Sequence, residues 1–269
     1  MDITFFWASF ILYFCSTLLH TGYLAFNREK LARAATLVLF LAWLAQGAAF
    51  IVRVRACGHL PLTNMFEFIT MLAWFAGLAY LVSAFYLRFR LLEALAGPVI
   101  FMLYVCASLL PKESNQQLMP ALQSYWLQIH VSMAAAGESV FLLAFVAAVL
   151  YLLKAGGKGA GGFLGRMPDA EKLDDMTYRF IMIGYPLFTM GALFAGAIWA
   201  YRAWGTFWSW DPKETCSLIA WIVYSVYLHA RLTRQWRGKK TAWLAVAGFL
   251  TTLLTFFANL LLGGLHSYN

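Results

Sequence analysis

The sequence predicts an all-α protein that crosses a membrane eight times, with both termini on the outer (periplasmic or lumenal) side. Three observations support this prediction. The 269 residues are 62% hydrophobic and only 12% charged, whereas a soluble domain has about 25% charged residues. Eight separate runs are apolar over the length needed to cross about 30 Å of hydrocarbon. Basic residues are concentrated in alternate connections between these runs. The composition excludes a disordered chain, a collagen-like repeat and a disulfide-rich scaffold.

The eight apolar runs are expected to form membrane-spanning helices in chain order. The seventh is short and begins after Asp211 and Pro212, because aspartate is a favoured helix N-cap and proline a favoured first helical residue. No basic residue precedes the first run and no small-residue cleavage site follows it, so we interpret it as a retained helix. We expect residues 1–269 to form a single transmembrane domain. The runs cover approximately residues 4–25, 34–52, 66–87, 92–111, 129–153, 180–200, 215–230 and 241–262.

Basic residues predict the orientation of these spans. Fifteen of the 20 lysines and arginines lie in the connections between spans one and two, three and four, five and six, and seven and eight. The positive-inside rule places these four connections in the cytoplasm or its equivalent. The net charge of +8 is explained by this topology, so nucleic-acid binding is not needed to account for it.

The longest inner connection, at about 154–179, contains a glycine-rich stretch from Ala155 to Gly162. It lacks the Gly-Lys-Ser/Thr ending and the preceding strand of a phosphate-binding loop, so we interpret it as a flexible linker. The residues from Asp169 to Asp175 carry charges of both signs. They predict a solvated amphipathic turn.

Two histidines and one connection are expected to meet at the outer face. His130 opens the fifth span, His266 follows the eighth, and residues 201–214 connect spans six and seven on the same side. His229 is different, because it lies 14 residues past Thr215, or roughly 21 Å deeper at about 1.5 Å per residue.

Two further histidines, His20 and His59, lie at or near helix ends. His20 is late in the first span and reaches a depth similar to that of His229. An ionisable residue inside a membrane span is a functional candidate by default. Anchoring at the membrane interface is the simpler explanation for both His20 and His59.

The connection between spans six and seven holds three closely spaced tryptophans, Trp204, Trp208 and Trp210. An aromatic belt at the level of the lipid headgroups is the ordinary explanation for such residues, but a belt is scattered over helix ends. Clustered indoles form an apolar slot for a large planar ligand, and histidines beside the slot can ligate an iron at its centre. A haem held by His130 and His266 would meet both requirements.

Several segments resemble the haem-handling proteins of cytochrome c assembly. Trp-Gly-Thr-Phe-Trp-Ser-Trp-Asp at 204–211 resembles their tryptophan-rich signature, and Pro-Lys-Glu-Thr at 212–215 narrows the resemblance to the CcsA (or ResC) type, the membrane subunit of the System II cytochrome c synthetase. Other segments resemble those around the family's external and membrane-embedded histidines and the stretch before its third span. These segments are 120–131, 227–231, 264–268 and 58–67.

The resemblance implies a site for haem b at the outer face. His130 and His266 would be its axial ligands. The platform beneath the haem would consist of Trp204, Gly205, Trp208, Trp210 and Asp211.

The resemblance also implies a second haem site inside the membrane, through which haem passes from the inner side. His229 would be one ligand of that site. The other ligand is usually attributed to the partner subunit, CcsB (also called ResB). His20 lies at a depth that would allow it to substitute.

The implied reaction is haem lyase (holocytochrome c synthase) chemistry within a complex. Two thiols of an apocytochrome c CxxCH motif add across the haem vinyl groups and form thioethers. The chain would hold and orient reduced haem, because the substrate supplies its own nucleophiles. A thioredoxin-like thiol reductant is an expected further partner. The expected location is a bacterial inner membrane, or a thylakoid membrane in a plastid.

Three more charged residues have open interpretations. Glu138 lies eight positions after His130 within the fifth span, where it could pair with an arginine, relay a proton or contact a haem propionate through a cation. Arg53 and Arg55 are on the outer side. They could neutralise haem propionates or contact lipid headgroups, and lipid contact is the simpler interpretation.

Other functions remain open from the sequence. A CcmC-type protein would deliver or export haem without forming bonds, but it usually has six spans. A diheme cytochrome b-like electron-transfer subunit would pair His20 with His229 and His130 with His266, and would leave the tryptophan loop without a purpose. A haem or small-molecule transporter would carry out no chemistry at all.

Overall fold

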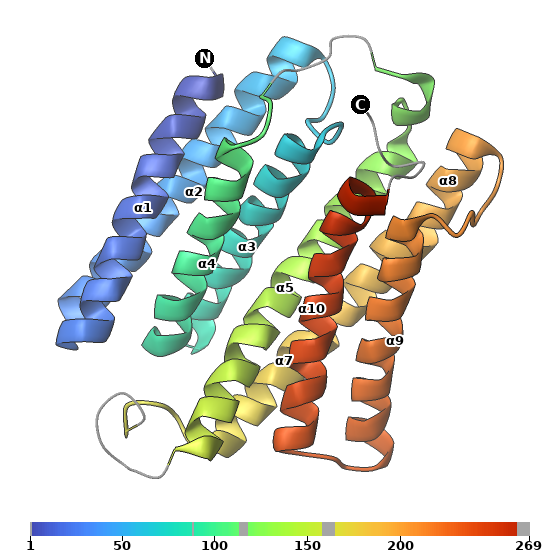
Figure 1. The fold of residues 1–269 in the computed structure, drawn as a ribbon. Helices are drawn as coiled ribbons and strands as arrows, with labels where there is room; N and C mark the ends of the chain where they lie inside the picture. Colours follow the sequence, from blue (N-terminus) through green and yellow to red (C-terminus); the bar gives the residue numbers. More distant parts are fainter. Residues whose placement is uncertain (1, 88, 113–117, 158–164, 263–269) are drawn as a thin grey trace. The chain divides into compact units, whose positions relative to one another are not determined.

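The computed structural model describes residues 2–87, 89–112, 118–157 and 165–262, without the side chains of residues 2 and 256–262. All regular secondary structure in these ranges is helical. The chain divides into two compact units, Met1–Met119 (unit 1) and Pro120–Asn269 (unit 2) (Figure 1). The expected all-α membrane protein is therefore confirmed.

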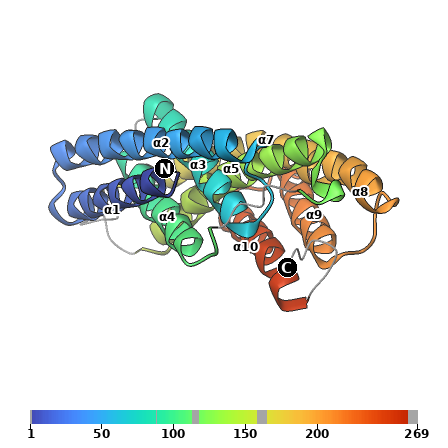
Figure 2. The same cartoon turned by 90° about the horizontal axis from the view of Figure 1, so that it is seen from above.

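Unit 1 contains four long helices in up-and-down order. The short connections between them require consecutive helices to run antiparallel, and α1 packs along α2 and α4 while α3 packs on α4 (Figure 2). Small residues of α2, including Ala32, Ala35 and Ala42, are fully or almost fully buried, which lets the helix backbones approach closely. The helices are α1 (Asp2–Phe26), α2 (Glu29–Cys57), α3 (Met65–Leu87) and α4 (Arg90–Ser108).

Unit 2 is built around α5, the longest helix described. The α5 helix packs on α7, on the π-helical turn η2 and on α10, and α10 packs on α9. Three of the elements, α7, η2 and α8, follow one another without a break and form one helical segment. The elements are η1 (Pro120–Leu122), α5 (Tyr125–Gly156), α7 (Ala170–Phe188), η2 (Thr189–Ala195), α8 (Gly196–Trp204), α9 (Pro212–Thr233) and α10 (Lys239–Leu262).

The directions of these helices bring distant parts of the sequence to one end of unit 2. The start of α5, the end of α8 and the start of α9 all lie at that end (Figure 1). We call it the tryptophan-loop end, because residues 204–211 connect α8 to α9 there. The ends of α5 and α9 and the starts of α7 and α10 lie at the opposite end.

Each of the eight expected spans overlaps a continuous helical segment, although the fourth extends past the end of α4 at Ser108. Six of the described helical segments are long and apolar enough to cross a membrane. The expected seventh and eighth spans, α9 and α10, are not among these six. The count of eight spans and the outer position of both termini remain predictions.

The prediction of a solvated turn from Asp169 to Asp175 is wrong. The structure begins α7 at Ala170, and Asp174 is buried in unit 2. Its carboxylate pairs with Arg231 of α9 and accepts hydrogen bonds from the backbone N–H of Gly238 and the hydroxyl of Thr241. These partners follow Asp174 by more than 50 residues, so the local charge pattern does not reveal them.

Candidate functional site

His130 lies in the second turn of α5, at the tryptophan-loop end of unit 2. The helix begins after Ser124, whose side chain accepts a hydrogen bond from the backbone N–H of Trp126. The His130 ring is half-buried and lies parallel to the indole of Trp199, with 5.7 Å between ring centroids and 9° between planes. The Trp199 indole is itself held, because its Nε1–H donates to the carbonyl of Ala121 at 2.9 Å.

The π-helical turn η2 orients the His130 ring. Nδ1 of His130 is 2.9 Å from the carbonyl oxygen of Gly191. The same carbonyl accepts the backbone N–H of Gly196, five residues later, so its two lone pairs serve the π-helix and the histidine. A π-turn inside an α-helix is rare and is frequent at functional sites.

This hydrogen bond determines the protonation pattern of the neutral ring. A carbonyl oxygen can only accept, so Nδ1 carries the hydrogen and Nε2 carries the lone pair. Metal-binding histidines commonly donate one ring N–H to a carbonyl or carboxylate in this way, which orients the coordinating nitrogen. His130 therefore has the tautomer and the fixed orientation of a metal ligand.

Glycine at position 196 leaves room for the ring. A Cβ atom there would lie 2.9 Å from Nδ1 and 3.0 Å from Cε1 of His130, closer than van der Waals contact allows. Sequence reasoning identified His130 but missed Trp199, Gly191 and Gly196. The only signal was the pair of glycines in an apolar span, which is common in membrane helices.

The tryptophan loop is compact and held by local bonds. Gly205 ends α8 in the left-handed region at φ +80°, which glycine adopts without strain. The Asp211 carboxylate is buried and caps α9 by accepting the backbone N–H of Lys213. Glu214 Oε2 accepts the backbone N–H and the hydroxyl of Ser209.

The indoles of the loop form two groups. Trp204 meets Trp199 edge to face at 4.8 Å, and so extends the stack that begins at His130. Trp208 and Trp210 pair edge to face at 5.8 Å, and the Trp210 side chain is 70% exposed. An exposed indole provides an apolar surface for a flat ligand.

The other expected ligands of unit 2 have different positions. His229 is exposed on the surface of α9, near the end opposite the tryptophan loop. His266 lies outside the described residues. Glu138 is buried on α5, one face of which packs against η2 and α7.

His20 lies inside unit 1 and is buried. Its Nε2 is 2.8 Å from the hydroxyl of Tyr80, and its Nδ1 is 3.3 Å from the hydroxyl of Ser16. The ring also fills the space beside Gly97 of α4, where a Cβ atom would lie 2.8 Å from Nδ1. Both ring nitrogens are thus engaged within unit 1.

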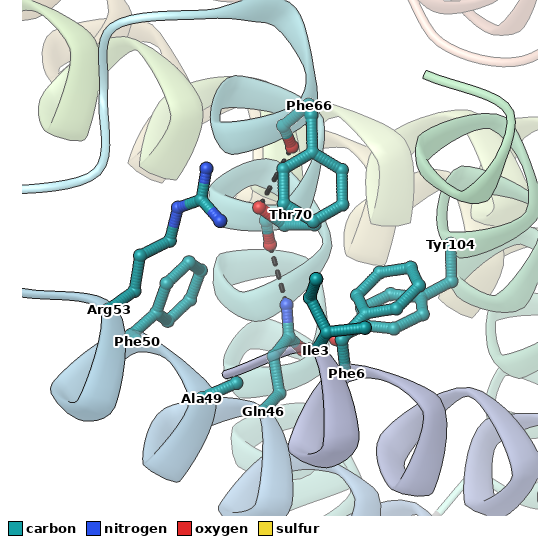
Figure 3. Close-up of a pocket in the computed structure, with 9 residues that line it drawn as sticks. All are labelled: Ile3, Phe6, Gln46, Ala49, Phe50, Arg53, Phe66, Thr70 and Tyr104. Atoms are coloured by element: carbon teal, nitrogen blue, oxygen red, sulfur yellow. Dashed lines mark hydrogen bonds between the residues drawn. The ribbon is translucent and has the colours of Figure 1, made fainter. Parts of the chain in front are cut away.

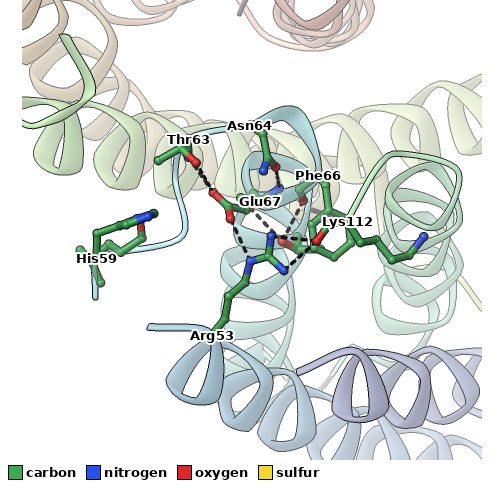
Figure 4. Close-up of polar contacts among 9 residues, drawn as sticks. Arg53, His59, Thr63, Asn64, Phe66, Glu67 and Lys112 are labelled. Atoms are coloured by element: carbon green, nitrogen blue, oxygen red, sulfur yellow. Dashed lines mark hydrogen bonds and ion pairs between the residues drawn. The ribbon is translucent and has the colours of Figure 1, made fainter. Parts of the chain in front are cut away.

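Arg53 is also committed to contacts within unit 1. Its Nε donates to Glu67 Oε1 at 2.8 Å, and its terminal nitrogens donate to the carbonyl of Lys112 (Figure 4). Glu67 Oε2 accepts from the backbone and the hydroxyl of Thr63. Arg53 therefore joins α2, α3 and the segment after α4, while Arg55 is exposed.

A small cavity lies next to Arg53 (Figure 3). It leaves about 20 Å³ of free space, which is room for a water molecule and far too little for a haem. The Gln46 side chain at its edge donates to the carbonyl of Thr70 at 2.6 Å. The lining residues are Ile3, Phe6, Gln46, Ala49, Phe50, Arg53, Phe66, Thr70 and Tyr104.

Comparisons with known proteins identify the family of this chain. The family model described as cytochrome C assembly protein matches residues 62–266. A cytochrome c biogenesis protein CcsA from Pyropia yezoensis is 36% identical, over 88% of this chain and 88% of its own length. Another CcsA, from a Picosynechococcus species, is 33% identical over 97% of this chain and 95% of its own length.

A solved structure shares the fold. Cytochrome c heme lyase CcmF superposes with a TM-score of 0.73 at 18% identity, over 96% of this chain and 46% of that chain. This chain thus corresponds to about half of CcmF, and at this identity the likeness concerns the fold alone. The family match and the CcsA relatives show that this chain belongs to the cytochrome c assembly protein family, and within it to the CcsA type.

Proposed function

We propose that this chain is the haem-handling subunit of a membrane-bound cytochrome c synthetase. It presents haem b at the outer membrane face and, with a CcsB/ResB-type partner, attaches it to the CxxCH cysteines of apocytochrome c. The observation that carries this proposal is His130, whose tautomer is set by the Gly191 carbonyl and whose ring stacks on Trp199 beside the tryptophan loop.

The residues at this end fit a haem as substrate. The neutral His130 imidazole offers a nitrogen lone pair of the kind that ligates haem iron, and the exposed Trp210 indole offers an apolar surface for the macrocycle. His266 is the proposed second axial ligand. The membrane-site ligand is His229, whose exposed position on α9 leaves it accessible to a ligand from a partner subunit.

The contribution of this chain is positional. The thiols of the apocytochrome are the nucleophiles, and each S–H adds across a vinyl group, so that a C–S bond and a C–H bond form. His130 and the indoles hold the macrocycle in one orientation, which converts an encounter between three groups into an intramolecular step. A thioredoxin-like reductant keeps the substrate thiols reduced. The proposed location is a bacterial inner membrane or a thylakoid membrane.

The visible spectrum of the chain tests this proposal when the chain is purified with its CcsB/ResB-type partner. We expect low-spin bands of b-type haem that are lost, or shift to high spin, in the His130→Ala/His266→Ala double variant. Thioether formation on an apocytochrome in the reconstituted system then separates a synthetase from a delivery protein. If neither the unmodified chain nor the double variant contains haem, under conditions in which control haem proteins are filled, the proposal is contradicted.

A further inference from the structure

A line of polar side chains follows one face of α9 and is not used by the proposed function. Lys213, Tyr224, Tyr227 and Arg231 are separated by 11, 3 and 4 residues, spacings that place them on the same side of a helix. Tyr224 and Tyr227 are both 0% exposed. From Lys213 to Arg231 the helix rises roughly 27 Å, nearly the about 30 Å thickness of the hydrocarbon layer.

Glu138 lies on the neighbouring helix α5, close to this line of side chains. Its side chain is 7% exposed, and its charge interacts with that of Lys213. The Tyr224 ring stacks on Phe141, one turn further along α5, at 3.7 Å between centroids. Tyr224 reaches α5 because Gly248 of α10 leaves space, since a Cβ atom there would lie 2.7 Å from the Tyr224 Cζ.

Three buried polar atoms in or beside this line have no protein partner in the part of the chain that the structure describes. Within the described residues, Glu138 Oε2 and the hydroxyls of Tyr224 and Tyr227 have no hydrogen-bond partner. A buried polar atom without a partner costs about 1–3 kcal/mol, so neighbouring atoms of this kind are an expensive arrangement. Such groups are usually satisfied by ordered water. Carboxylates inside membrane proteins often belong to proton relays.

The two ends of the line differ. Lys213 lies in the first turn of α9, on the tryptophan-loop side of Glu138. Its positive charge repels a proton that approaches Glu138 from the tryptophan-loop end. At the other end, Arg231 and Asp174 form a buried ion pair, and both also bind protein groups. Tyr224 lies between Glu138 and that end.

We propose that Glu138 is a proton-exchange site inside unit 2, and that the Tyr224 hydroxyl, together with bound water, relays protons to it from the Arg231 end of α9. On uptake, an O–H bond forms at the Glu138 carboxylate while the Tyr224 hydroxyl gives up its proton and accepts another from a protonated water, which carries the proton in from bulk solvent and is left as neutral water. On release, the same bonds break and form in reverse. No electron is transferred, so the step needs no oxidant or reductant.

The groups around Glu138 allow this assignment to be tested cleanly. Lys213 of α9 interacts with its charge, and Tyr224 of α9 stacks on Phe141, one turn further along α5. On α7, the hydroxyl of Tyr185 is bonded to that of Ser225 at 2.8 Å. Tyr224→Phe removes a hydroxyl that has no protein partner, so the fold should be unaffected or slightly stabilised. Tyr185→Phe is the matched control.

The experiment is infrared spectroscopy of the full chain in lipid bilayers, over a range of pH and during transfer from H₂O to D₂O. We expect a protonated-carboxyl band that disappears in Glu138→Gln and shifts quickly in D₂O. Tyr224→Phe should slow this shift roughly a hundredfold, the lower range for loss of a positioned proton-transfer group. Tyr185→Phe should leave it unchanged.

Two results would overturn the proposal. If no band sensitive to Glu138→Gln appears at any pH, Glu138 is a permanently ionised partner of Lys213. If the band exchanges equally fast in Tyr224→Phe, the hydroxyl does not relay protons. Neither measurement requires haem, so the outcome is independent of the proposed synthetase function.

Discussion

His130 in unit 2 and His20 in unit 1 are both held by hydrogen bonds, but in different surroundings. His130 is half-buried beside the tryptophan loop, and a carbonyl, which can only accept, sets its tautomer. His20 is buried, and hydroxyls contact both of its nitrogens. The Ser16 hydroxyl donates its hydrogen to the Ala35 carbonyl, so it accepts from Nδ1 of His20, and Nε2 of His20 accepts from the Tyr80 hydroxyl. The two histidines therefore share a tautomer. They differ because His20 is buried and its Nε2 lone pair is taken by a protein hydroxyl.

Replacing His130 should give the largest effect. In His130→Ala we expect haem affinity at the outer site to fall by more than the roughly 10–100-fold that follows loss of an outer-shell partner, because a coordinating nitrogen is removed. Haem titration followed in the Soret band, with the partner subunit present, measures this. His20→Ala in the same titration is the control. Equal affinities for His130→Ala and the unmodified chain would remove the distinction between the two histidines.

Moving His130 without removing it should have the next largest effect. Gly196→Ala places a methyl group against the ring and displaces Nδ1 from the Gly191 carbonyl. We expect about 10–100-fold weaker haem binding, with the fold retained. Gly156→Ala is the matched control, because nothing lies within 4 Å of a Cβ atom there. Similar losses in both variants would mean that the position of the His130 ring does not determine haem affinity.

Removing His20 should affect stability and leave outer-site haem binding unchanged. His20→Ala creates a cavity beside Gly97 and removes hydrogen bonds to Tyr80 and Ser16. We expect a loss of about 2 kcal/mol or more in unfolding free energy. Thermal unfolding in detergent measures it, with His59→Ala as the control. An unchanged melting temperature, together with lost haem, would instead assign His20 a ligand role.

The smallest effect is expected from changing Trp199, the indole that supports the His130 ring. Trp199→Phe keeps an aromatic face against the ring but loses the hydrogen bond to the Ala121 carbonyl. The loss should be about 1 kcal/mol, or roughly fivefold in haem affinity. Trp236→Phe, near the opposite end of unit 2, should leave the affinity unchanged. A loss as large as that in Gly196→Ala would show that the indole, rather than the carbonyl, positions His130.

Much of the helical architecture could be predicted because it depends on local composition. All eight apolar runs are helical, and the start of α9 follows from Asp211 and Pro212, as expected for a capping pair. The π-turn at 189–195 could not be predicted, since it differs from an α-helix by the register of a few backbone bonds. The helical start of α7 was missed because the partner of Asp174 is Arg231, far along the chain.

The candidate site likewise has features that could be predicted from the sequence and features that could not. Residue type and span order were sufficient to place His130 and the tryptophan loop at one end of unit 2, because alternate connections of an up-and-down bundle share a side. The roles of Gly191, Gly196 and Trp199 depend on side-by-side packing between α5 and the η2–α8 segment. The hydrogen bonds of Arg53 to Glu67 and of His20 to Tyr80 depend in the same way on packing between helices. Hydrophobicity and charge therefore determine which segments are helical and apolar and which face they present. Hydrogen-bond partners are set only when helices distant in sequence bring donor and acceptor atoms within about 3 Å of each other.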